Sequence, residues 1–245
     1  MKKLIVAFLL ATAPLLALAA GEGPHLDEAN IDLSDQASLQ RGAKYFVNYC
    51  LSCHSAKYQR YNRMAKDLGL TEEEVTDNLM FTTDKIGDTM NIAMTEAQGT
   101  AWFGNPPPDL SVLIRARGVD YIYTYLRSFY LDEKRPFGVN NTVFPDVGMP
   151  HVLWELQGTQ KAVYKTEEHG GHQTEVFDRF EPVTPGLLSA EEYDQVARDL
   201  TAFLSYVGEP IQMERKRLGI WVLLFIAVFF VLAYLLKKEY WKDIH

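Results

Sequence analysis

Apolar residues recur at helical spacing before the first cysteine. Between Asp35 and Cys50 they fall on one helical face, at Leu39, Ala43, Phe46, Val47 and Cys50. Asp35 suits the N-cap position, because its carboxylate can accept a hydrogen bond from a free backbone amide. Gly42 lies beside the apolar face and would allow a second helix to approach closely. The pattern therefore predicts a buried helix that runs from Asp35 to Cys50.

A second helix is predicted after Ser189. Ser189 and Glu192 form an S-x-x-E capping box, in which each side chain satisfies a free backbone amide at the helix start. The buried face that follows comprises Val196, Leu200, Phe203, Leu204 and Val207. Gly208 and Pro210 end the helix.

Weaker helical patterns and one loop-rich region separate these two helices. Helices are expected at Glu72 to Met80, Pro108 to Ala116 and Asp120 to Tyr130. From Leu131 to Pro185 the chain is rich in Gly, Pro and Asn, which predicts long loops with a short hairpin near Val163 and Val176. Taken together, the elements predict a mainly α fold.

The N-terminus has the pattern of a secretory signal peptide. Lys2 and Lys3 precede an apolar run from Leu4 to about Leu18, and Ala17-Leu18-Ala19 is an A-x-A cleavage site. Pro14 and the small residues favour cleavage after Ala19 over an uncleaved anchor. Residues 1–19 are thus expected to be removed, and residues 20–209 form the exported domain.

A second apolar segment lies near the C-terminus. Residues 218–236 carry no charge, and a helix of these 19 residues would span about 28 Å, close to the roughly 30 Å hydrocarbon core of a bilayer. Basic residues flank both ends, so the local charges do not decide the orientation. Export of the N-terminal part decides the orientation, and it places the tail 237–245 in the cytoplasm. Residues 210–236 are the membrane-proximal segment and the transmembrane helix.

The exported body is strongly acidic. The net charge of the chain is −8, the signal peptide carries +2, and the segment from Arg215 onward carries +4. The body from Ala20 to Glu214 therefore carries −14. Such a charge repels nucleic acid and suits a basic protein partner, although acidity alone would also keep a domain soluble.

The two cysteines belong to a haem attachment motif. Cys50-Leu51-Ser52-Cys53-His54 is C-x-x-C-H, in which each thiol can add to one haem vinyl group and the histidine lies under the iron. A zinc site would need more ligands than this pair offers, and a thioredoxin-like motif would need a βαβ context. One covalent haem c is predicted.

Met149 is the preferred candidate for the sixth iron ligand. It lies in a loop from Phe144 to Pro150 that Pro145 and Pro150 stiffen, and Gly148 allows close approach of the backbone. A histidine ligand stays open as an alternative. The other candidates are Met64, Met80, Met90, Met94, Met213 and the remaining histidines, of which His169 and His172 have the pattern of exposed loop residues.

Four stretches resemble one family, cytochrome c1 of the bacterial type, the haem subunit of the cytochrome bc1 complex. They are Arg41-Gly42 with Tyr49 to Ser55; Pro107 to Ser111 running into Arg115 to Gly118 and Asp120-Tyr121; Phe144-Pro145 with Met149-Pro150; and Glu209-Pro210 with Arg215 to Gly219. Asp146 departs from the pattern, because the family usually has glycine there.

The resemblance implies a class I c-type cytochrome-like haem domain with a single C-terminal transmembrane helix. It implies that the helices ending at Cys50 and beginning at Ser189 cross at Gly42, Phe46 and Phe203. It also implies Met149 as the sixth ligand, Arg117 and Tyr121 as partners of a haem propionate, and Pro108 as a further haem-binding residue. Surface charge and core packing are the alternative roles of Arg117 and Tyr121.

The implied function is electron transfer at the bacterial inner membrane, with the haem domain in the periplasm. Electrons would pass from the Rieske iron–sulfur protein to a soluble cytochrome c, within a dimeric complex that also contains cytochrome b. The alternatives are the c-type subunit of a terminal oxidase or nitric-oxide reductase, and a haem enzyme such as a peroxidase. The single C-x-x-C-H motif and the C-terminal anchor disfavour both.

Overall fold

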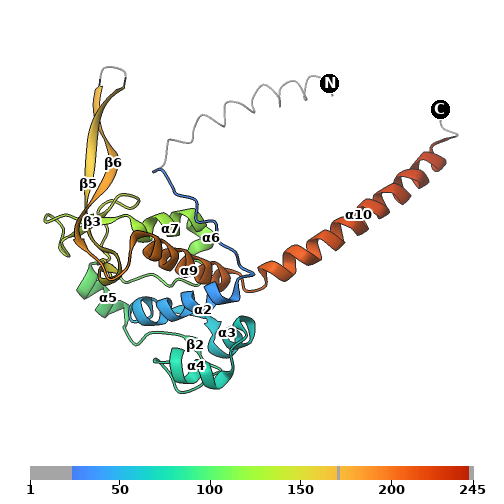
Figure 1. Cartoon of the computed structure of the whole chain (residues 1–245). Coiled ribbons are helices and arrows are strands. Elements are labelled where there is room, and N and C mark those ends of the chain that lie inside the picture. The colour runs from blue at the N-terminus through green and yellow to red at the C-terminus, as the bar shows by residue number, and fades with distance from the viewer. Residues whose placement is uncertain (1–23, 170–171, 243–245) are drawn as a thin grey trace.

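A computed structural model describes residues 24–169 and 172–242 of the chain. The expected signal peptide lies outside these residues. The described part is mainly helical, with three two-stranded antiparallel sheets. A helical body carries a long hairpin on one side, and a single long helix projects away from it (Figure 1).

The core is built on the predicted pair of helices, α2 (Gln36–Tyr45) and α9 (Ala190–Gly208). Asp35 caps α2, and Ser189 and Glu192 form the capping box of α9, as predicted. A Cβ atom on Gly42 would lie 2.1 Å from the carbonyl oxygen of Asp199, so only glycine fits where the helices cross. The rings of Phe46 and Phe203 pack beside this point, with centroids 5.5 Å apart. The implied crossing is confirmed.

An ion pair between the half-exposed Arg41 and the buried Asp199 joins the same two helices. Arg41 donates two hydrogen bonds to the carboxylate of Asp199, at 2.7 and 3.0 Å, and Ser38 donates a third at 2.6 Å. The Asp199 side chain is only 1% exposed, so its charge depends on these partners. The contact fixes the register of α2 against α9.

The remaining helices and short strands surround this pair. They are α3 (Tyr61–Leu68), α4 (Glu72–Leu79), α5 (Glu96–Phe103), α6 (Leu113–Arg117), α7 (Val119–Arg127) and α8 (Trp154–Gln157), with strands β1 (Ala56–Arg60), β2 (Thr89–Met90), β3 (Phe129–Leu131) and β4 (Val139–Asn141). β1 pairs with β2, and β3 pairs with β4. The helix predicted at Glu72 to Met80 is confirmed as α4.

Two predicted helices are shorter than expected. The segment from Pro108 to Val112 is not helical, because prolines 106–108 lack amide donors and Asp109 bonds outside the segment. α7 ends at Arg127, and the following residues leave the helix to pair with β4 as β3. Aromatic side chains such as Phe129 suit either element, so their spacing alone did not distinguish them.

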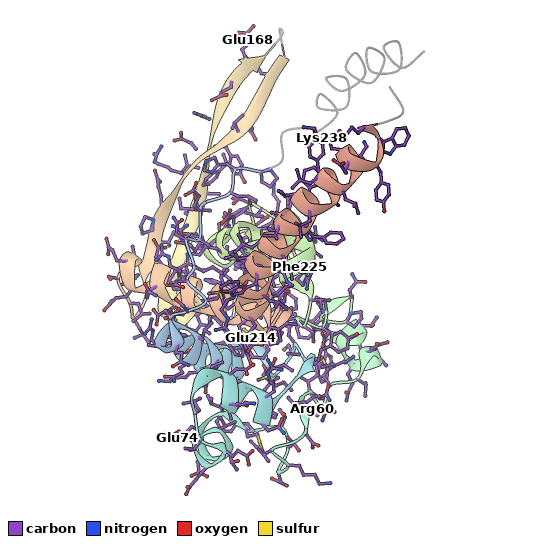
Figure 2. The ribbon with its side chains drawn as sticks, turned by 90° about the vertical axis from the view of Figure 1, so that its right-hand side faces the viewer. Arg60, Glu74, Glu168, Glu214, Phe225 and Lys238 are labelled. Atoms are coloured by element: carbon purple, nitrogen blue, oxygen red, sulfur yellow. The ribbon has the colours of Figure 1, made fainter. Side chains whose placement is uncertain are left out.

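The predicted hairpin is much longer than expected. β5 (Gly158–His169) and β6 (His172–Pro185) pair along their whole length, and Val163 and Val176 both lie within the ladder. Figure 2 shows Glu168 at the outer end of the hairpin, far from the helical body. Most of the region expected to be loop is therefore regular strand.

The C-terminal apolar segment is part of α10 (Gln212–Tyr240). Among the described residues, α10 is the one helix long and apolar enough to cross a membrane, with a mean hydropathy of 2.8 in its most apolar window. Its side chains face outward, as Figure 2 shows for Phe225. At its start Arg215 binds the carboxylate of Glu209, which also lies 3.7 Å from Arg115 on α6. The anchor is thus tied to the body.

Candidate haem-binding site

The cysteine motif follows a widened end of the first core helix. α2 continues into a π-helical turn, Phe46–Cys50, and the amide of His54 donates to the carbonyl of Cys50 at 2.8 Å. Neither cysteine forms a disulfide. Burial raises the pKa of Cys50 to about 12, unlike the low pKa of a thioredoxin-like thiol. The described residues also contain no cluster of three metal-binding His, Cys, Asp or Glu side chains, so the donor set does not suit zinc.

His54 is oriented by Pro108. Its Nδ1 lies 2.8 Å from the Pro108 carbonyl oxygen, which can only accept, so Nδ1 carries the proton and Nε2 is left to bind a metal. Burial lowers the pKa of His54, which favours the neutral imidazole that metals need. The structure therefore brings Pro108 to the motif, as a backbone acceptor for the histidine.

Asp109 holds the Pro108 segment against the motif. Its carboxylate accepts from the Ser55 hydroxyl and the Lys57 amide, each at 2.9 Å, and from the Ser111 amide at 2.9 Å. Burial alone would raise the pKa of Asp109, but these hydrogen bonds outweigh it and lower the pKa. No sequence pattern predicted this role of Asp109, and its position beside Pro108 was the one signal that pointed to it.

The Met149 loop is pinned by three polar side chains. The Asn141 amide oxygen accepts from the backbone amides of Val143 and Phe144, and that of Asn140 accepts from Asp146. Arg135 donates to the Asp146 carboxylate at 2.8 Å and to its carbonyl oxygen at 2.7 Å. Asp146 has a φ of 61°, the conformation that favours glycine.

Within this loop, the Met149 sulfur accepts a hydrogen bond. The donor is the Tyr125 hydroxyl on α7, at 3.3 Å. Gly148 approaches the chain less tightly than predicted, because an added Cβ would lie an ordinary 3.4 Å from the Phe103 carbonyl oxygen. The loop nevertheless lies beside α5, and Gly99 of α5 packs on Pro107. Helix α5 thus contacts the Met149 loop at Phe103 and the segment that orients His54 at Pro107.

Ring contacts link Arg117 and Tyr121 to Tyr125. The Arg117 guanidinium is 5.4 Å from the centre of the Tyr121 ring, which stacks on Tyr125 with centroids 6.3 Å apart. Met149 is therefore connected to both predicted propionate partners through Tyr125, which bonds to its sulfur and stacks on Tyr121.

Most of the alternative methionine ligands lie away from the Met149 loop, and Met94 is the exception. Met64, Met80 and Met90 are buried in the hydrophobic core. Met94 is half-buried beside Gly99, and Met213 is half-exposed on α10. The backbones of His169 and His172 pair at the outer end of the hairpin.

The residues fit a covalently attached haem. A buried cysteine and its partner stand at attachment spacing, the adjacent histidine presents Nε2, and a methionine lies in a braced loop. Combined with a membrane-length helix after a helical body, they define a membrane-anchored c-type cytochrome.

The sequence matches the Cytochrome C1 family over residues 28–163 and 188–244, and the chain belongs to this family. It is 57% identical to cytochrome c1 of Allochromatium vinosum, over all of both chains. It is 47% identical to the ammonia monooxygenase gamma subunit of Nitrosomonas europaea, over all of this chain and 98% of that one. Cytochrome c1 of Rhodospirillum rubrum is 28% identical over 86% of this chain and 83% of its own length.

Family membership confirms the predicted fold class and the predicted role. The chain is the haem-bearing electron-transfer subunit of a cytochrome bc1 complex, with a c-type haem as its cofactor. Residues 164–187, which include most of the hairpin, lie outside the matched ranges.

Proposed function

We propose that this chain takes one electron at a time from the Rieske iron–sulfur protein and passes it to a soluble cytochrome c. It would do so beside cytochrome b in a dimeric complex of the bacterial inner membrane. The observation that carries the proposal is the His54–Pro108 hydrogen bond, because it prepares a histidine next to two cysteines as an iron ligand. Family membership supports the same role.

Cys50 and Cys53 would hold one haem c through thioether bonds, and His54 would bind its iron from one side. The haem supplies a one-electron couple when bound. The surrounding core, with Phe46 fully buried, keeps water away and so helps set the potential.

Met149 would bind the iron from the other side. A thioether is a neutral, soft ligand that favours Fe(II) and raises the potential. With His54 and Met149 both bound, the iron would have no open site for a substrate, so the chain would transfer electrons without chemistry of its own. Arg117 and Tyr121 would bind a haem propionate, since a guanidinium and a phenol can both donate to a carboxylate.

Replacement of Met149 by leucine tests the ligand assignment. Met149→Leu keeps the side-chain volume, so the complex should assemble and the haem should stay with the polypeptide in acid acetone. The weak near-infrared sulfur-to-iron band should vanish, the potential should fall, and the ferrous haem should bind carbon monoxide.

Met94→Leu is the matched control and should keep the band and the potential. If Met149→Leu keeps both, the assignment of Met149 is wrong, and loss of the band in Met94→Leu or Met90→Leu would identify the ligand instead. Purification in mild detergent tests the partners, because cytochrome b and a Rieske protein should accompany the chain.

A further inference from the structure

Tyr125 is hydrogen-bonded to the candidate ligand sulfur. Its hydroxyl donates to the Met149 sulfur at 3.3 Å, across a sequence separation of 24 residues. In the described part of the chain this hydroxyl has no other hydrogen-bond partner. The resemblance to the family pointed to Tyr121, one helical turn earlier, and no sequence pattern singled out Tyr125.

The Tyr125 ring is held on two sides. It stacks on Tyr121, with centroids 6.3 Å apart and planes 12° apart, and it meets the edge of Phe129 at 5.2 Å. These two ring contacts restrict the movement of the Tyr125 ring and so of its hydroxyl oxygen. A tyrosine ring held in this way keeps its hydroxyl oxygen near one position, here beside the Met149 sulfur.

The backbone of Tyr125 is also tied to the ligand loop. The Asn141 side-chain amide donates to the Tyr125 carbonyl oxygen at 2.9 Å, while its oxygen accepts from Val143 and Phe144 at the start of the loop. The Asn141 side chain therefore bridges α7 and the loop, and the contact between the Tyr125 hydroxyl and the Met149 sulfur lies beside this bridge.

A thioether sulfur has two lone pairs, so it can bind iron with one and accept a hydrogen bond with the other. The hydrogen bond draws electron density from the sulfur and makes it a weaker donor, which destabilises Fe(III) more than Fe(II). We propose that Tyr125 is a positioning residue that holds the Met149 sulfur in place and raises the reduction potential of the haem through this hydrogen bond. This inference rests on the proposed ligation by Met149.

Tyr125→Phe removes the hydroxyl and keeps the ring. In the purified complex the haem should stay attached and the sulfur-to-iron band should remain, at a shifted wavelength. Because one hydrogen bond has a modest net effect, Fe(II) should lose about threefold to tenfold in stability relative to Fe(III). For a one-electron couple this is a fall of about 28 to 59 mV.

Tyr123→Phe is the matched control on the same helix. Tyr123 is 2% exposed and accepts a hydrogen bond from Arg198 at 3.2 Å, far from any contact with Met149. Its variant loses one buried hydroxyl and should be less stable, but its potential should not change. If the potential fell only because a hydroxyl of α7 was lost, it would fall in Tyr123→Phe as well as in Tyr125→Phe.

A double-mutant cycle then isolates the sulfur. In a Met149→Leu background the Tyr125→Phe change should leave the potential where it is, because the acceptor has gone. An unchanged potential and band in the single Tyr125→Phe variant would overturn the inference, and so would an equal fall in both backgrounds. The ligand assignment fails separately, if Met149→Leu keeps its band.

Discussion

The residues that hold the Met149 loop are polar side chains distant in sequence from the C-x-x-C-H motif. Asn140, Asn141 and Arg135 bind backbone groups of the loop and leave Met149 little freedom. Asp146 shows why the departure from the family pattern is tolerated. Its φ of 61° is open to Asp and Asn as well as to glycine, and its carboxylate gains a partner in Arg135.

Asp109 should contribute stability that depends on pH. Asp109→Asn leaves one acceptor oxygen for three donors, so it should cost about 1 to 2 kcal/mol at pH 7, with water in part replacing the lost bonds. The hydrogen bonds lower the pKa of Asp109 in the folded state. Its contribution is therefore full above the unfolded pKa of about 3.9 and is lost as the pH falls through the folded value.

Denaturant unfolding at several pH values measures this effect. The difference in unfolding free energy between wild type and Asp109→Asn should be constant near neutral pH and shrink below about pH 4. Asp84→Asn is the matched control, because Asp84 is exposed and has no hydrogen bond or ion pair within the described residues. A difference that stays constant down to low pH would contradict the assigned role.

Among the elements, the α2–α9 crossing tolerates the least change. Gly42→Ala would place a Cβ 2.1 Å from a backbone oxygen and 2.6 Å from the Phe203 Cβ, and neither atom belongs to a flexible side-chain end. The helices must separate, so the variant should lose about 2 kcal/mol or more of stability, as overpacked cores do. Thermal unfolding followed by circular dichroism measures the loss.

Gly87→Ala is the control, because an added Cβ there meets nothing within 4 Å. Its unfolding temperature should stay near that of the wild type. Equal stability of Gly42→Ala and the wild type would mean that the two helices do not cross as tightly as the structure shows.

Element lengths depended on contacts between distant segments. The hairpin β5–β6 exceeds its predicted length because each strand supplies the other with backbone partners over 12 and 14 residues. α6 begins late because Asp109 bonds to Ser55 and Lys57. Spacing of apolar residues within one segment does not report such partners, which is why α2 and α9 were predicted closely while the hairpin and α6 were predicted with the wrong lengths.

At the scale of the whole molecule, we predict an exported haem domain and a cytoplasmic C-terminal tail. The signal-peptide pattern and the single anchor α10 support this orientation. Protease added to spheroplasts should digest the body and leave the tail. A body that stays protected until the membrane is permeabilised would reverse the orientation.

The acidic body predicts electrostatic steering of its electron acceptor. A charge of −14 on residues 20–214 should attract a basic cytochrome c and speed its association. The reaction should slow as salt rises, since charges are screened over roughly 8 Å at physiological ionic strength. Stopped-flow rates should fall with rising salt for a basic cytochrome c and should not change for an uncharged small oxidant. A flat rate with the basic partner would refute steering.

The sequence by itself determined the features that are local in the chain. The C-x-x-C-H motif, the capping box at Ser189, the apolar face of α9 and the membrane-length segment each lie within one continuous stretch, where spacing and residue type are sufficient. The order of four such stretches identified the family, which the comparison confirmed. The proposed ligand Met149 was selected in the same way and stays a prediction.

Only the tertiary structure decided which distant groups meet. That Pro108 fixes the tautomer of His54, that Asp109 holds that segment, and that Tyr125 donates to Met149 all depend on contacts between residues 24 to 54 positions apart. A hydrogen bond needs two groups within about 3 Å and in line, and sequence spacing does not specify that geometry across separate elements. Helix packing at Gly42 and pairing of β3 with β4 place these groups, and so decide how the candidate site is built.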